Sequence, residues 1–141
     1  MKILSWLFRN TANINALESS VIEAIAESLP DASAKVLRVQ VQLINKVQRL
    51  DQDREVDLYR IEKGKIVFPE NVLFANQSDE FELARLKVTD TETGHGTNAV
   101  VSLVKGRLFC IEFSHDPRDL KESRNLQIIV QSIVDPMIIS K

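Results

Sequence analysis

The sequence predicts an α+β domain in which N-terminal helices pack on one face of a mostly antiparallel sheet of about six strands. Apolar residues recur at helical spacing near the start of the chain, and over most of the remainder they alternate with polar residues. Turn-forming residues separate the alternating runs. The 141 residues fit one domain, residues 1–141, which can bury a core without a disulfide or a metal ion.

Composition and charge narrow the classes of function. The 18 basic and 20 acidic residues give a net charge of −2, so no long-range positive field attracts nucleic acid. Cys110 is the only cysteine, which rules out an intramolecular disulfide and cysteine-rich zinc sites and favours a reducing compartment. No stretch approaches the roughly 18 apolar residues of a membrane span. We therefore expect a cytoplasmic protein that needs no cofactor and no metal.

The first ten residues have the pattern of a short amphipathic helix. The apolar run from Ile3 to Phe8 is too short for the core of a secretory signal. We expect this helix to cover part of the core. The alternative is contact with a membrane surface through residues 3–8, which two basic residues, Lys2 and Arg9, support poorly.

A second helix is predicted from Asn13 or Asn15, either of which can cap it, to Leu29, where Pro30-Asp31 ends it. Its apolar positions form one stripe: Leu17, Val21, Ile22, Ile25 and Leu29. Its glutamates are interpreted as a solvated face: Glu18, Glu23 and Glu27.

From Ala34 the pattern changes to strict alternation, which predicts a half-buried strand from Leu37 to Leu43. After a turn at residues 51–53, a strand is predicted from Val56 to Ile61. For the hairpin at Lys63-Gly64, side-chain pattern and turn chemistry favour different registers. A two-residue turn would pair three well-matched couples, but it places Lys63 in a left-handed conformation. The couples are Glu62 with Lys65, Ile61 with Ile66 and Tyr59 with Phe68.

The second half of the chain is predicted to form mainly strands. Pro69 to Asp79 is predicted as a loop over Val72, Leu73 and Phe74, because proline cannot donate to a central ladder. Glu80 to Thr89 is predicted as a strand whose apolar phase slips by one residue, as at a β-bulge.

Thr97 to Ser114 is predicted as a hairpin with the three-residue loop Val104-Lys105-Gly106. This register opposes Leu103 to Arg107, Val101 to Phe109, Ala99 to Ile111 and Thr97 to Phe113. It gathers a core side made of Leu103, Val101, Phe109, Ile111 and Phe113. A two-residue turn is the less favoured alternative, since it requires Lys105 at positive φ.

The last elements are a short helix and a strand. Asp116 can cap a helix that starts at Pro117 and reaches about Ser123. Leu126 to Val134 fits either a helix or a strand by periodicity, and five of its nine residues are β-branched, which favours the strand.

Candidate catalytic groups are few. His95 lies near Asp90 and Glu92 in a glycine-containing loop, a spacing that matches no established metal motif and reads as a solvated loop. His115 and Cys110 are five residues apart, which puts them on opposite faces of an extended strand. Cys110 is therefore interpreted as a small buried apolar residue, and Glu112 as an edge carboxylate on the same face.

These considerations favour a non-catalytic protein–protein interaction module, of the immunity or adaptor type, that neutralises or organises a protein partner. The predicted partner-binding residues alternate outward on two strands: Arg38, Gln40, Gln42, Arg85 and Lys87. The alternative is a small hydrolase or transferase that uses Glu112, His95 or His115. The sequence does not identify the partner or the oligomeric state.

Overall fold

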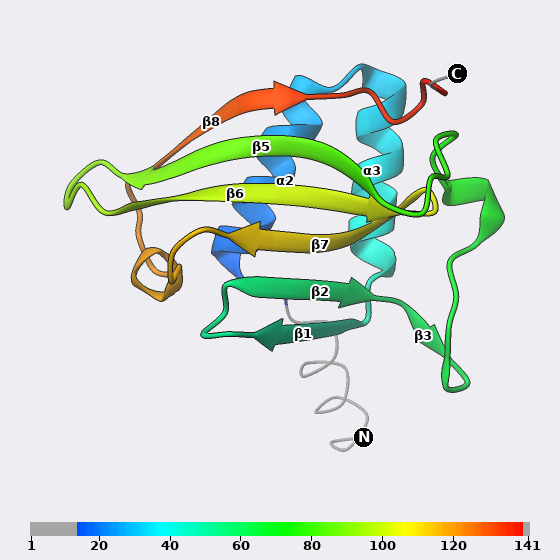
Figure 1. Cartoon of the computed structure of the whole chain (residues 1–141), viewed down its shortest axis with the longest axis horizontal. Helices are drawn as coiled ribbons and strands as arrows, with labels where there is room; N and C mark the ends of the chain where they lie inside the picture. Colours follow the sequence, from blue (N-terminus) through cyan, green and yellow to red (C-terminus); the bar gives the residue numbers. More distant parts are fainter. Residues whose placement is uncertain (1–13, 140–141) are drawn as a thin grey trace.

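The computed structural model describes residues 14–139 of the chain, so the predicted helix in the first ten residues lies outside the described part. Two α-helices come first and strands follow (Figure 1). The elements are α2 (Ala16–Ser28), α3 (Asp31–Leu43), β1 (Lys46–Leu50), β2 (Glu55–Tyr59), β3 (Ile61–Glu62), β4 (Lys65–Ile66), the 3-10 turn η1 (Glu70–Val72), β5 (Phe81–Asp90), β6 (Gly96–Val104), β7 (Arg107–Phe113), the 3-10 turn η2 (Arg118–Leu120) and β8 (Leu126–Ile133).

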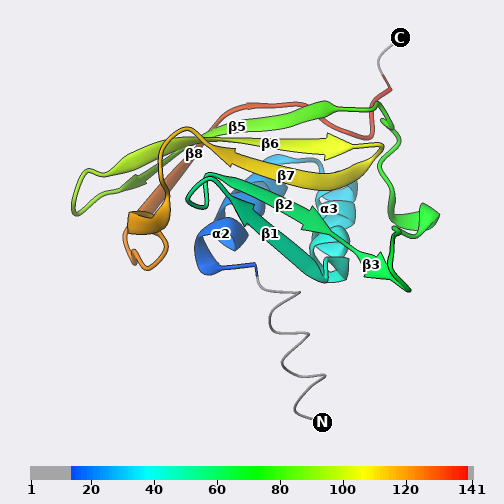
Figure 2. The same ribbon diagram turned by 60° about the horizontal axis from the view of Figure 1, so that its bottom comes forward.

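Six strands form one antiparallel sheet in the order β1-β2-β7-β6-β5-β8, and β3 and β4 form a separate two-stranded ribbon. Helices α2 and α3 both lie against the same face of the six-stranded sheet (Figures 1 and 2). The predicted α+β architecture is confirmed. No helix among residues 14–139 is long and apolar enough to cross a membrane.

Helix α2 forms as its sequence predicts. The Asn15 side chain caps it by accepting from the backbone N–H of Glu18 at 2.8 Å. The predicted apolar stripe is buried against the sheet: Leu17, Val21, Ile22, Ile25 and Leu29.

The predicted strand from Leu37 to Leu43 is wrong, because this segment is helix α3. Its buried positions Ala34, Leu37 and Gln40 are spaced by three residues, which is one face of a helix. The alternation of valines and glutamines reproduced the strand pattern by coincidence, and packing on the sheet selects the helix. The strand that follows is β1, which the sequence prediction missed.

Gln40 is fully buried, and its hydrogen bonds connect α3 to the turn end of the β6–β7 hairpin. Its side-chain Nε2 donates to the backbone oxygens of Val72 at 2.7 Å and Gly106 at 2.9 Å. Its Oε1 accepts from the backbone N–H of Leu108 at 2.7 Å. One amide therefore makes three hydrogen bonds to the backbone, and the two to Gly106 and Leu108 are buried.

The β6–β7 hairpin has the two-residue turn, which is the less favoured alternative in the sequence prediction. Lys105 and Gly106 both have positive φ, 51° and 82°, and form a two-residue turn that pairs Val104 with Arg107. A register shift at Ser102/Leu103 then brings Leu108 and Ile111 to the core side. A Cβ at Gly106 would meet the Phe74 carbonyl oxygen at 2.8 Å, so this position needs glycine.

Phe109 is therefore not part of the core side, contrary to the predicted register. It lies on the opposite face, where its ring makes an edge contact with Tyr59 at 5.7 Å between centroids. The cost of a left-handed Lys105, about 1–2 kcal/mol, is offset by the burial of Leu108, which is 0% exposed. At Lys63-Gly64 the two-residue turn also forms, with Lys63 at φ 51° and with Ile61 paired to Ile66.

Other predicted elements agree with the structure. Phe74 is buried beneath the loop after β4, and β5 pairs with β6 through a register shift between Glu82 and Ala84, where the bulge was predicted. Leu126 to Ile133 is strand β8, paired with β5. The predicted helix after Asp116 is reduced to the 3-10 turn η2.

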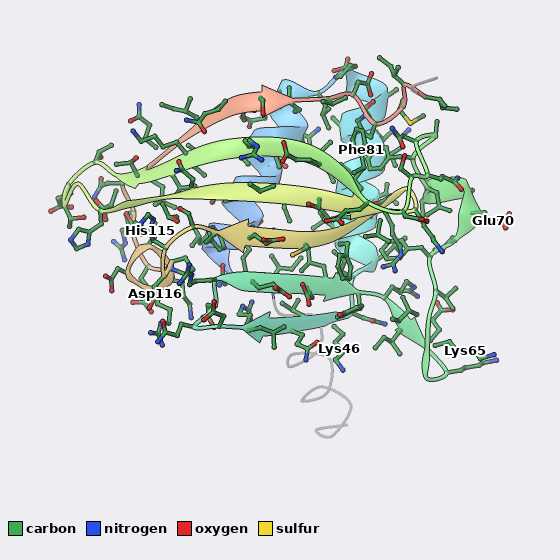
Figure 3. All side chains as sticks on the ribbon, in the orientation of Figure 1. Lys46, Lys65, Glu70, Phe81, His115 and Asp116 are labelled. Carbon is green, nitrogen blue, oxygen red and sulfur yellow. The ribbon has the colours of Figure 1, made fainter. Side chains whose placement is uncertain are left out.

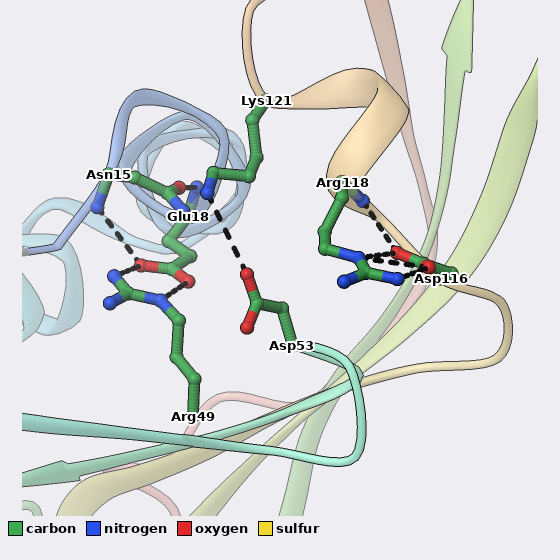
Figure 4. Close-up of polar contacts among 7 residues, drawn as sticks. All are labelled: Asn15, Glu18, Arg49, Asp53, Asp116, Arg118 and Lys121. Atoms are coloured by element: carbon green, nitrogen blue, oxygen red, sulfur yellow. Dashed lines mark hydrogen bonds and ion pairs between the residues drawn. The ribbon is translucent and has the colours of Figure 1, made fainter.

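Glu18 corrects the interpretation of the α2 glutamates as a solvated face, because it is 1% exposed. Its Oε1 accepts from the Asn15 backbone N–H, and both carboxylate oxygens accept from Arg49 of β1 at 2.7 and 2.8 Å (Figure 4). Nearby, Lys121 and Asp53 form a longer ion pair at 3.7 Å. The bidentate ion pair between Glu18 and Arg49 holds the start of α2 against the edge strand β1.

We predict that Gln40→Leu lowers the free energy of unfolding by about 1–3 kcal/mol, because it leaves the buried Leu108 N–H without an acceptor. Gln42→Leu, two residues along at an exposed position of the same helix, is the matched control and should change it by less than about 0.5 kcal/mol. Urea unfolding of both variants measures the difference. Equal effects would mean that the Gln40 hydrogen bonds contribute nothing net.

Candidate interaction surface

The five predicted partner-binding residues do not share a surface. Gln40 lies in the interior, while Arg38 and Gln42 lie on the exposed side of α3, where Arg38 pairs with Glu23 at 2.6 Å. Arg85 and Lys87 lie on β5, exposed between buried neighbours. The structure therefore separates the set, and only Arg85 and Lys87 project from the sheet.

The face of the sheet that α2 and α3 leave uncovered is here called the open face (Figures 1 and 2). Arg85 and Lys87 project from it, because they are exposed and alternate along β5 with residues of the buried core. One row of cross-strand neighbours runs over it, from Glu55 on β2 to Glu112 on β7, Val100 on β6 and Arg85 on β5. Residues paired side by side in a sheet project from the same face. The row therefore places two carboxylates at one end and a guanidinium at the other.

The acidic end of the open face also includes Asp57, which is 7% exposed and pairs in register with Cys110. The neighbouring carboxyl of Asp57 raises the pKa of the Glu55 carboxyl, and the negative charge of Glu112 raises it further. Asp57 Oδ1 is buried without a hydrogen-bond partner among the described residues. Three carboxylates are thus gathered where β2 pairs with β7.

Sequence reasoning missed Glu55 and Asp57, although a signal was present. In Glu55-Val56-Asp57-Leu58 the acidic residues alternate with apolar ones, which places both carboxylates on one face of a strand. The buried Val56 and Leu58 take the core face. The acidic residues must then project from the open face.

The basic end lies on β5. The Arg85 guanidinium donates to both carboxylate oxygens of Glu82, at 2.9 and 2.7 Å, and this pairing raises the pKa of Arg85. Lys87 is exposed and pairs in register with Asn98 of β6. Within residues 14–139 no ion pair joins Lys87 to a carboxylate. Its ammonium group is therefore available to a partner.

Two shallow hollows connect these groups. One, of about 410 Å³, is lined by residues that include Arg54, Arg85 and Glu112. The other, of about 350 Å³, is lined by residues that include Lys87 and His115. Asn98 lines both hollows, so they are neighbours on the open face. Together they offer charged groups of both signs and neutral hydrogen-bonding groups to one contact surface.

The two histidines lie at the margin of this surface. His115 and Asp116 are in the loop that follows β7 (Figure 3). His115 Nδ1 is 3.0 Å from Ser114 Oγ, but that hydroxyl also accepts from the Asn98 backbone N–H at 3.0 Å. Asp116, which could orient an imidazole in a catalytic triad, instead accepts from Arg118.

His95 and His115 line a hollow that does not include Glu112, so the three residues of the alternative catalytic hypothesis do not converge. Asp90 accepts from the backbone N–H groups of Glu92 and Thr93, which gives it a role in the loop structure. In the described part of the chain, no cluster of three potential metal ligands occurs. Among the described residues, these groups are thus spread over a surface and do not form one cluster.

Comparison of the chain with protein-family models, with curated proteins and with solved structures found no match.

We predict that Cys110 reacts slowly with iodoacetamide in the native protein. Burial raises the pKa of its thiol, and hydrogen bonding with Asp57 raises it further. At mildly alkaline pH the reaction should be at least about a hundredfold faster in urea, since each pKa unit reduces the thiolate fraction about tenfold.

An exposed thiol on the same face supplies the control for this measurement. Asn98→Cys in a Cys110→Ser background should react at nearly the same rate with and without urea, because position 98 is exposed. Native and urea rates within about threefold for Cys110 would show that its thiol is accessible and that this part of the open face is not packed.

Proposed function

We propose that this protein is a non-catalytic interaction module that binds a protein partner through the open face of its sheet. The observation that carries the proposal is the row of outward-facing groups from Glu55 and Glu112 to Arg85, on a sheet whose other face is covered by helices. A surface with both signs of charge selects a partner with the opposite arrangement and fixes its orientation.

The charge distribution also favours protein over nucleic acid as the partner. Arg85 and Lys87 share the open face with Glu55, Asp57 and Glu112, so a phosphate backbone laid across it would meet carboxylates. The whole chain has a net charge of −2. A folded protein with its own mixture of charges matches such a surface better than a polyanion does.

Within this class we favour a cytoplasmic protein of the immunity or adaptor type, which acts by covering or organising its partner. Such a role requires a preformed surface and no reacting group. The open face supplies such a preformed surface, because Arg85, Lys87 and Glu112 stand on strands of the central sheet. Of the predicted partner-binding residues, Arg85 and Lys87 are retained in this proposal.

The test is charge reversal on each side of the molecule. We predict that Arg85→Glu with Lys87→Glu weakens binding of a partner captured from the native cytosol at least about tenfold, equivalent to about 1.4 kcal/mol, and alters its salt dependence. Exposed charges on an interface act through complementarity, so reversing two of them replaces attraction with repulsion.

The matched control is Lys35→Glu with Arg38→Glu on α3. It makes the same change in net charge as the β5 variant. Each variant also removes one exposed arginine–glutamate ion pair: Arg38 with Glu23 at 2.6 Å in the control, and Arg85 with Glu82 at 2.7 Å in the β5 variant. We expect it to leave affinity within about threefold. The proposal fails if the α3 variant loses the partner and the β5 variant keeps it. It also fails if no partner is captured and a substrate screen finds turnover that depends on His95, His115 or Glu112.

A further inference from the structure

Strand β8 is an edge of the sheet. It pairs with β5 on one side, and within residues 14–139 no strand pairs with its other side. Figure 1 shows β8 as the outermost arrow, beyond β5. The outer backbone N–H and C=O groups of an edge strand form a ladder ready to accept another extended strand.

The sequence of β8 lacks the usual protection of such an edge. From Leu126 to Val134 the chain has no charged residue and no proline. The opposite edge, β1, has 5 residues against 8 in β8 and includes Lys46 and Arg49. One bulge interrupts β8, where its register with β5 shifts between Arg85 and Leu86. The regular part is therefore Leu126 to Val130.

Side chains along this regular part leave apolar surface open. Ile128 and Val130 pair with Val88 and Leu86, which are fully buried, yet both are only partly buried themselves. Because β5 covers one flank of these side chains, we attribute their remaining exposure to the flank that faces away from β5. On the open face, Ile129 pairs with Lys87 and is 48% exposed. An added strand would cover both the core-side flank and part of Ile129.

We propose that β8 pairs antiparallel with β8 of a second copy of this chain, centred near Ile128. In this register Leu126 lies opposite Val130 of the second copy on the core side, and Gln127 lies opposite Ile129 on the open face. The strand can therefore pair with itself: apolar residues meet apolar residues on the core side, the neutral Gln127 meets Ile129 on the open face, and no like charges come into contact. The occupant is an extended strand because only extended backbone can complete the ladder.

Symmetry gives this dimer a definite shape. A two-fold axis that joins two antiparallel edges into one continuous sheet is perpendicular to the sheet, so both helix layers lie on one side and both open faces on the other. The two Lys87 positions are three strand spacings apart across the sheet, roughly 14 Å, and are also offset along the strands. That exceeds the Debye length of about 8 Å at physiological ionic strength, so the basic ends do not oppose pairing.

The test is sedimentation equilibrium of the full chain and of three double variants. Gln127→Lys with Ile129→Lys places like charges opposite each other twice in the proposed register, and should raise the dimer Kd at least about tenfold. Gln127→Glu with Ile129→Lys places opposite charges there and should keep the dimer. Gln48→Lys with Leu50→Lys, at exposed positions of β1, adds the same charge at the other edge and should also keep it.

A wild-type chain that stays monomeric at all accessible concentrations overturns the proposal. A dimer that survives the Gln127→Lys and Ile129→Lys changes, or one that the β1 variant abolishes, likewise excludes pairing through β8. Retention of the dimer by the Glu/Lys variant and its loss in the Lys/Lys variant together support the proposed register. Because the binding proposal is tested on β5 with a captured partner, either proposal can fail without the other.

Discussion

The cover that α2 and α3 place on one face of the sheet is the constraint on which the remaining structure depends. Each strand must direct its apolar residues toward the helices, and where the sequence falls out of phase the backbone changes register. The shifts at Ser102/Leu103 on the β6–β7 ladder and at Glu82/Ala84 on β5 are examples, and each brings buried apolar residues to the helix side. The side chains that do not face the helices project from the open face, and most of them are polar or charged.

Polar contacts then fix where the helix layer sits. At the β1 edge, buried Glu18 receives the Arg49 guanidinium. Further across, Gln40 binds the backbone of Gly106 in the β6–β7 turn and of Leu108 just after it. Apolar packing alone tolerates sliding of a helix over a sheet, whereas a buried group that must keep its partner tolerates very little. These two side chains therefore set the position of the helices relative to the strands that carry the open face.

Much of this fold could be predicted from the sequence, because periodicity, caps and turn residues report local physics. The sequence prediction failed at α3, where the buried Gln40 looked like a solvent-facing residue of a strand and the alternation concealed a helical face. It also failed for the β6–β7 register, since the cost of a left-handed Lys105 is local while the burial of Leu108 that offsets it is not. For the candidate surface, Arg85 and Lys87 were found by their alternation, and Glu55 was not.

The most direct test of the central claim, that the partner contacts the open face and leaves the helix layer free, is lysine acetylation of the free protein and of the complex, followed by mass spectrometry. Lys87 lies on the open face and Lys35 on the exposed side of α3. Open-face binding predicts that Lys87 becomes at least about fivefold slower to acetylate in the complex while Lys35 is unchanged, because a buried amine in an interface is shielded from reagent. Protection of Lys35 with Lys87 unaffected would contradict the claim.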